Sequence, residues 1–184
     1  MASSDLPPLS TDGVFSMTAS SDISASRDKV WGILMDFPKY KEWNPFVRGQ
    51  IIVSLKSPKT PLPDQTPVNG AYLRLNPVHI NASMDDKSVW LSMSSSERIS
   101  TLDHENFRCA WGMNIPLPKW LLYAERWQTL TTVQRDGKDV TRYETLVVFW
   151  GVLAYLLNVL IGSGLRKSSQ AMSEALKKRA EDAL

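Results

Sequence analysis

The sequence predicts an α+β fold in which a strongly curved antiparallel sheet wraps around one long carboxy-terminal helix. Apolar residues recur in steps of three, four or seven positions from Leu153 through Leu165 to Leu176, the period of a helix with one buried face. The chain before this helix shows instead the two-residue alternation of β-strands separated by short turns. Because consecutive strands joined by short turns form an antiparallel sheet, the helix is expected to cover its concave face.

The apolar run at residues 145–161 has two interpretations. Its length is near the lower limit for a membrane-spanning helix. Gly151 interrupts it, however, and the residues before Gly151 are β-branched and aromatic, as in a strand. We therefore expect a final strand at 139–150 and then a helix of roughly thirty residues with the helical apolar period. A membrane-associated protein stays a minor alternative because the run is so apolar.

The first part of the chain predicts one strand and two short helices. Residues 14–23 form the strand, and residues 24–28 begin a helix with serine or aspartate available as its cap. Val30, Trp31 and Leu34 form the apolar stripe of that helix, which ends before Pro38. Residues 38–45 are expected to form a second helical turn with aromatic anchors.

Six further strands are predicted, which brings the sheet to seven. They lie at residues 47–55, 68–80, 88–102, 107–113, 122–135 and 139–150, with turns at 85–87, 103–106 and 136–138. Four prolines fall within residues 56–67, a composition that the interior of a sheet does not tolerate. We predict a surface loop there.

Composition points to one globular domain at residues 14–184, preceded by a disordered tail at 1–13 that has no periodic apolar pattern. The 184 residues are 43% hydrophobic and 22% charged, enough for one core. Twenty-one basic and 19 acidic residues leave a net charge of +2, without the single-sign field that a nucleic-acid partner requires.

The cysteine and histidine content and the amino-terminal sequence bear on three features: disulfides, metal sites and a secretory signal. The single cysteine, Cys109, excludes an internal disulfide, and two histidines do not predict a metal site. The amino terminus has no basic region followed by an apolar core, so no secretory signal is expected. We expect a soluble, cytoplasmic protein.

The first helix and the segment after it resemble a known superfamily. Residues 25–31 read ASRDKVW, and residues 36–46 read DFPKYKEWNPF. This opening resembles that of the helix-grip superfamily (SRPBCC), which contains START domains, birch-allergen-like proteins, plant hormone receptors and polyketide cyclases/dehydrases. The resemblance covers residues 14–182 and is specific for fold, because members of the superfamily bind or transform many unrelated ligands.

The resemblance implies a single hollow domain. A seven-stranded grip would surround the carboxy-terminal helix and leave an internal cavity, gated by the loops at 114–119 and 81–87. The same comparison places Glu97 and Glu144 at cavity-lining positions and Arg48 where relatives carry a basic residue. Two carboxylates and an arginine in an apolar cavity would have shifted pKa values and are our candidate catalytic groups.

Strand parity supplies a list of ligand-binding candidates. On the strand from residue 107, the bulky alternates include Cys109 and Trp111, which we expect to face inward. On the next strand, one alternate set contains the aromatics and an acid, and the resemblance favours that set. Together with positions on the last strand and helix, the candidates are Cys109, Trp111, Glu125, Trp127, Thr129, Tyr143, Leu157 and Ile161.

Two functions of different classes are compatible with this cavity. The first is a cyclase/dehydrase-type enzyme that acts without a cofactor on a hydrophobic polyketide or terpenoid intermediate. Glu97 or Glu144 would transfer protons, and Arg48 or Tyr143 would polarise an oxygen. The second is a non-catalytic carrier of a lipid or another hydrophobic metabolite. We prefer the enzyme, because three ionisable groups in the pocket are more than lipid carriage requires.

Overall fold

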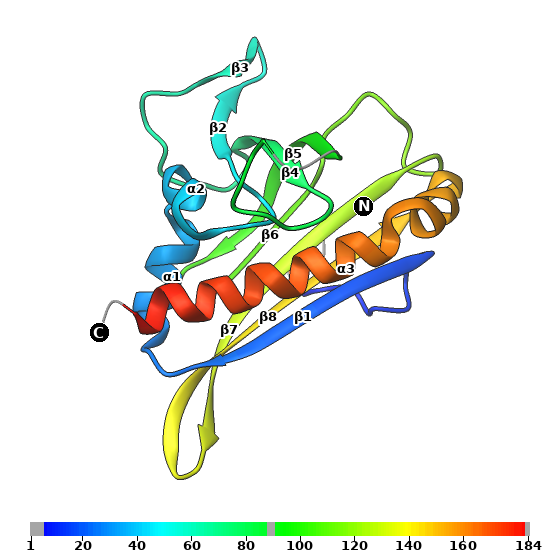
Figure 1. Ribbon diagram of the computed structural model, residues 1–184. Helices are drawn as coiled ribbons and strands as arrows, with labels where there is room; N and C mark the ends of the chain where they lie inside the picture. Colours follow the sequence, from blue (N-terminus) through cyan, green and yellow to red (C-terminus); the bar gives the residue numbers. More distant parts are fainter. Residues whose placement is uncertain (1–5, 88–90, 183–184) are drawn as a thin grey trace.

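The computed structural model describes residues 6–87 and 91–182 and has the predicted α+β architecture (Figure 1). Its strands are β1 Phe15–Ile23, β2 Gln50–Ser54, β3 Ser57–Pro61, β4 Tyr72–His79, β5 Ser92–Asp103, β6 Arg108–Met113, β7 Tyr123–Arg135 and β8 Lys138–Trp150. Its helices are α1 Arg27–Met35, the short 3₁₀ turn η1 Phe37–Lys39, α2 Tyr40–Trp43 and α3 Val152–Glu181. The order of strand, short helices, strands and long helix is the predicted order.

The strands form one antiparallel sheet, which in the described residues has eight strands in the order β1-β8-β7-β6-β5-β4-β2-β3. The extra strand is β3, which lies within the segment predicted to be only a loop. All five residues of β3 are exposed, and it pairs with β2 alone. Proline has no N–H group to donate. It is tolerated on such an edge because only one neighbouring strand requires hydrogen bonds from β3.

The short helices begin and end where the sequence predicts. The side chain of Ser26 caps α1 by accepting a hydrogen bond from the Lys29 amide, and α1 ends at Met35, three residues before Pro38. Phe37, Tyr40 and Trp43 are buried and contact one another edge to face. These rings anchor the short helices to one end of the core.

Helix α3 lies across the concave face of the sheet, and Figure 1 shows it running the length of β1. Leu165, Met172 and Leu176 are buried on its inner side. Near Gly164 the helix approaches the chain so closely that a Cβ atom would lie 2.9 Å from the backbone oxygen of Ile80. One turn later, the Ser168 hydroxyl donates to the same Ile80 oxygen at 2.7 Å. These contacts hold α3 against the loop that follows β4.

Gly151 turns the chain from β8 into α3. It has φ +95° and ψ 164°, a conformation that is essentially restricted to glycine. A Cβ atom there would lie 2.6 Å from the backbone of Leu121. Just beyond it, the amides of Val152 and Leu153 donate to the carbonyls of Trp120 and Leu121. The loop before β7 thereby satisfies N–H groups that the first turn of a helix leaves unpaired.

Residues 6–13 precede β1 and contact the end of β8. The amide of Leu9 donates to the Asp12 carboxylate, and the Trp150 indole donates to the Asp12 carbonyl at 2.9 Å. Residues 1–5, and residues 88–90 of one predicted strand, lie outside the described residues. The expected disorder of residues 1–13 and the expected cytoplasmic location stay predictions.

The apolar run at 145–161 divides into β8 and α3 as predicted. Across the described residues, no helix is both long and apolar enough to pass through a membrane.

Replacing Gly151 by alanine tests the turn between β8 and α3. We expect Gly151→Ala to lower the free energy of unfolding by about 3 kcal/mol, because a Cβ meets the Leu121 backbone and the conformation is disfavoured. Gly137→Ala is the matched control. Gly137 also has a positive φ, but its Cβ would meet nothing within 4 Å, so the loss should be about 1 kcal/mol. Urea unfolding measures both, and equal losses would contradict the close approach.

Candidate functional site

A cavity of about 360 Å³ lies between the concave face of the sheet and the amino-terminal half of α3. Most of the side chains around it are apolar. They are Met17, Phe46, Val47, Leu75, Val78, Ile80, Met93, Trp111, Met113, Ile115, Leu122, Ala124, Val147, Phe149, Leu157, Ile161 and Leu165. The polar members are Ser94, Ser95, Glu97 and Arg126. The site is therefore an apolar chamber with one carboxyl group, that of Glu97, and one guanidinium group, that of Arg126.

The register of three neighbouring strands decides which side chains reach this chamber. Trp111 on β6 lies opposite Arg126 on β7, which in turn lies opposite Val147 on β8. Directly paired residues point to the same face of a sheet. All three line the cavity, so the even-numbered residues of β7 face inward. The inward orientation predicted for β6 is confirmed, since Trp111 and Met113 line the cavity and Cys109 is buried.

The parity predicted for β7 is wrong. Glu125, Trp127 and Thr129 lie on the outer face of the sheet and do not line the cavity. Trp127 suggested the core because it is aromatic, and it is indeed only 2% exposed. Its burial is on the other side of the sheet, where its indole donates to the Glu125 carboxylate and where residues 7–10 border the same surface hollow.

Glu144 is also on the outer face, and the prediction that it lines the cavity is wrong. Its side chain is exposed, and its partners across the sheet are Thr129 on β7 and Ser20 on β1. The neighbouring Tyr143 takes the inward position instead, because successive side chains of a strand point to opposite faces. Glu144 has no route to a ligand in the cavity.

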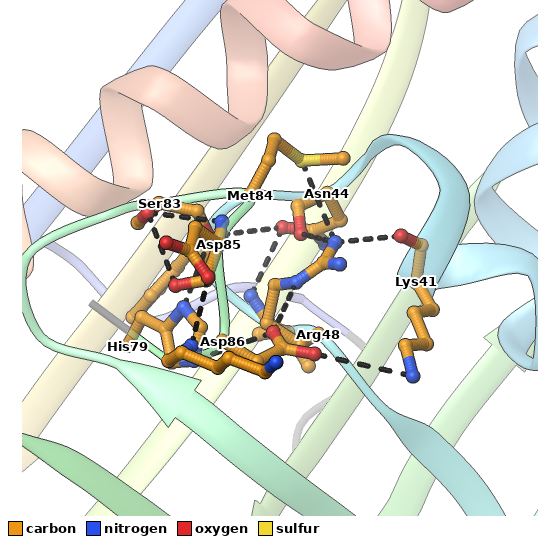
Figure 2. A network of polar contacts seen from close by, with 11 residues as sticks. Lys41, Asn44, Arg48, His79, Ser83, Met84, Asp85 and Asp86 are labelled. Carbon is orange, nitrogen blue, oxygen red and sulfur yellow. Dashed lines mark hydrogen bonds and ion pairs between the residues drawn. The ribbon is translucent and has the colours of Figure 1, made fainter. Parts of the chain in front are cut away.

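Arg48 is buried, but it does not line the cavity and belongs instead to a separate polar cluster (Figure 2). Its Nε donates to the Asp86 carboxylate at 2.8 Å, and one Nη donates to the carbonyls of Lys41 and Asn44. These hydrogen bonds occupy the guanidinium and hold the pKa of Asp86 below its usual range. The expectation that Arg48 lies in the cavity is therefore wrong, and its contacts hold the surrounding chain together.

The same cluster fixes one wall of the cavity. The Asn44 side chain accepts hydrogen bonds from the amides of Phe46 and Val47, both at 3.0 Å, and both of these residues line the cavity. His79 connects the cluster to the loop after β4, because its Nδ1 donates to the Ser83 carbonyl (Figure 2). The sequence WNPFVR thus supplies wall residues together with the groups that hold them.

Cys109 and Tyr143 are buried beside the cavity without lining it. Burial raises the pKa of the Cys109 thiol and of the Tyr143 hydroxyl well above their usual ranges. The Tyr143 hydroxyl donates to the Gln128 amide oxygen at 2.6 Å, so its proton is engaged within the core. Leu157 and Ile161 line the cavity from α3, as the sequence predicts.

Glu97 lies in the cavity wall, as the resemblance implies. The Ser95 hydroxyl donates to one of its carboxylate oxygens. Removal from water disfavours the charged carboxylate and raises the pKa of Glu97 to about 7, an effect that the Ser95 hydrogen bond and the more distant Arg126 only partly oppose. At neutral pH this carboxyl therefore exists in both protonation states.

Arg126 is the functional candidate that the sequence reasoning missed. It is 7% exposed, and its guanidinium carbon lies 5.1 Å from the centre of the Phe46 ring. Within the described residues no carboxylate lies in salt-bridge range of it. The two-residue turn at 136–137 was the sequence signal that indicated the strand position opposite Arg126. In a hairpin closed by two residues, positions equally far from the turn face each other, which pairs Arg126 with Val147.

The opening of the cavity lies among its least buried residues. Met93 is exposed, and Ile115, Leu157 and Ile161 are half-buried. They come from β5, from the loop before β7 and from α3. Ile115 belongs to the predicted gating loop 114–119. Of the second predicted gate, 81–87, no described residue lines the cavity, and the gating roles of both loops stay predictions.

No group of three or more His, Cys, Asp and Glu side chains that could hold a metal ion occurs in residues 6–87 and 91–182. The sequence matches no protein-family model and no curated protein.

Solved structures, in contrast, match nearly the whole chain. A protein from Helicobacter pylori is 12% identical with a TM-score of 0.65, over 92% of this chain and 90% of the other. A START superfamily protein from Mycobacterium smegmatis is 17% identical with a TM-score of 0.58, over 92% and 99%. Norcoclaurine synthase from Thalictrum flavum, a point mutant in complex with a transition-state analogue, is 14% identical with a TM-score of 0.59, over 91% and 94%. The protein therefore has the helix-grip fold that these structures share.

Proposed function

We propose that this protein binds a hydrophobic small molecule in the cavity beneath α3. The observation that carries the proposal is the lining, in which apolar side chains from the sheet, the loops and α3 surround about 360 Å³. Ligand sites for small molecules are concave, mostly apolar and of this size. Transfer of an apolar ligand from water into such a chamber is favourable by about 25 cal/mol for each Å² buried.

The lining also suits ligands of irregular shape. Met17 on β1, Met93 on β5 and Met113 on β6 contribute flexible side chains to the lining. Trp111 adds a large rigid surface, held edge to face by Phe37 with ring centres 6.0 Å apart. Flexible and rigid apolar groups together fit a ligand with an aliphatic or polycyclic body.

A specific observation supports a second candidate, an enzyme of the cyclase/dehydrase type that needs no cofactor. Glu97 lines the cavity with a pKa of about 7, and a group that gains and loses a proton near neutral pH is a good general acid or base. Arg126, rather than Arg48 or Tyr143, is the group positioned to polarise an oxygen of the substrate. The substrate class remains that of polyketide or terpenoid intermediates.

Native mass spectrometry of the protein purified from its own host tests the binding function. A retained hydrophobic metabolite is expected, and it would identify the ligand class. Incubating wild type and Glu97→Gln with that metabolite then separates the two candidates. Chemical conversion by wild type that the variant loses supports the enzyme, whereas unchanged metabolite with both supports binding alone.

A tryptophan placed in the cavity wall should block binding. Leu157 lines the cavity, whereas the adjacent Leu156 is 54% exposed on the outside of α3. We expect Leu157→Trp to weaken the binding of the neutral fluorophore N-phenylnaphthylamine at least about tenfold, because the indole fills the ligand's space. Leu156→Trp is the matched control and should bind as wild type does. Equal affinities of both variants, measured by fluorescence titration, would place the ligand elsewhere.

The raised pKa of Glu97 predicts a pH dependence of stability. Between the ordinary pKa of 4.5 and the folded-state value of about 7, the folded protein holds a proton that the unfolded chain has released. The stability contributed by Glu97 should therefore fall as pH rises through this window and then level off. Glu97→Gln should lack this component, so its stability relative to wild type should rise over the same window in urea titrations. A constant difference would show that Glu97 titrates normally.

A further inference from the structure

We propose that Arg126 binds an anion inside the cavity and that the ligand is a monocarboxylate with an apolar body. This inference rests on the proposed function and makes its ligand class more specific. It follows from the position of one buried cation in an otherwise apolar chamber.

The guanidinium of Arg126 is surrounded by groups that do not neutralise it. A guanidinium has five N–H donors, and the acceptor that the described residues offer it is the Met172 sulfur at 3.6 Å, which is a weak one. The Phe46 ring stabilises the cation through its face but accepts no strong hydrogen bond. Glu97, the acid of the same cavity, is outside salt-bridge range and half protonated near pH 7.

Such a cation is costly for the fold. Burying a charge without a partner is strongly unfavourable, and an apolar side chain of similar length would pack at the same position. Arg126 lines a chamber of about 360 Å³, which is large enough for a ligand. A bound anion would supply the missing acceptors, and the fork of N–H groups matches the two oxygens of a carboxylate.

The charge balance favours a carboxylate over a phosphate. Arg126 is the single cation among the lining residues of the described chain, and Glu97 adds negative charge whenever it is ionised. A monoanion neutralises one guanidinium, whereas a phosphate dianion would leave a second charge in an apolar surrounding. The rest of the ligand must be apolar, because the lining offers it only Ser94, Ser95 and Glu97 as further polar partners.

Matched ligands and matched variants test the proposal. Dodecanoic acid and dodecanol have the same chain and differ in the carboxylate, and each can displace N-phenylnaphthylamine from the cavity. We expect wild type to prefer dodecanoate, and Arg126→Met to weaken dodecanoate about ten- to hundredfold while dodecanol is unchanged. Arg126→Lys should retain part of the preference. Arg98→Met, which removes an exposed arginine from β5, two strands away from β7 in the sheet, should behave as wild type does.

The outcomes separate the two proposals. If wild type binds the fluorophore and dodecanol but shows no preference for dodecanoate, the anion site is overturned and hydrophobic binding stands. If wild type binds none of them, the proposed function itself fails. The preference of wild type for acid over alcohol decides the question even if Arg126→Met does not fold.

An independent observation concerns the surface around the opening. The amino-terminal half of α3 exposes Val152, Tyr155, Leu156, Val159 and Leu160, with Val159 84% and Leu160 67% exposed. Leu117 and Trp120 extend this apolar rim onto the loop before β7, whose Trp120 carbonyl receives the Val152 amide. We infer that this apolar rim docks on an anionic lipid surface.

Charge and residue type favour lipid over a protein partner. Residues 113–122 and 146–173 contain no acidic residue, and their charged members are Lys119, Arg166 and Lys167. Exposed leucine and valine combined with tryptophan, tyrosine and flanking cations is the composition of segments that lie at a membrane interface. The rim borders Leu157, Ile161 and Ile115 at the cavity opening, so docking would face that opening toward the lipid.

Vesicle flotation tests the docking. Wild type should float with phosphatidylcholine vesicles that contain phosphatidylserine and less with phosphatidylcholine alone, because the flanking cations add attraction. Leu160→Gln should reduce flotation severalfold. Leu55→Gln is the matched control, since Leu55 is 62% exposed on the connection between β2 and β3. No flotation of wild type, or a lipid-free dimer that Leu160→Gln dissociates, would overturn the proposal.

Discussion

One helix has to cover the concave face of a strongly curved sheet, and the rest of the structure follows from this constraint. A helix is only about 10 Å across with its side chains, so it cannot fill the space within long curved strands along its whole length. At the carboxy-terminal half of α3, large rings from the short helices complete the core, among them Tyr40 and Trp43. Beside the other half, the described residues form no such helices, and a chamber remains between Leu157 on α3 and Trp111 on the sheet.

The chamber persists because its walls are held from outside it. Gly151 and the carbonyls of Trp120 and Leu121 set the start of α3, and Ser168 fixes the helix to the Ile80 carbonyl. On the opposite wall, Asn44 holds the backbone that carries Phe46. Moving either wall inward would break these hydrogen bonds and leave their polar groups without partners, which is unfavourable. Polar interactions at the edge thereby maintain an apolar interior.

The chemistry of the chamber depends on Glu97 and Arg126, which the apolar surroundings affect differently. Removal from water raises the pKa of Glu97 and keeps that carboxyl partly neutral. Arg126 places a guanidinium cation in the same apolar surroundings. The acid adapts to the apolar surroundings by protonation, whereas the cation can be compensated only by a partner. This difference is the reason that the two candidate functions assign Glu97 to proton transfer and Arg126 to recognition of an oxygen or an anion.

The sequence by itself determined the fold class and, apart from β3, the order of elements, because local periodicity, caps and turns act over a few residues. The division at Gly151 and the inward face of β6 followed from the same local signals.

The tertiary structure alone decided which face of β7 and β8 lines the cavity. Both faces of β7 carry large side chains, and Trp127 is buried on the outer face by the amino-terminal segment and its neighbours. The alternation of large and small residues along a strand is the same whichever face is buried against the cavity. Which set of side chains faces the cavity therefore depends on contacts between residues that are far apart in the chain. For the same reason Arg48 and Glu144 proved to lie outside the chamber and Arg126 inside it.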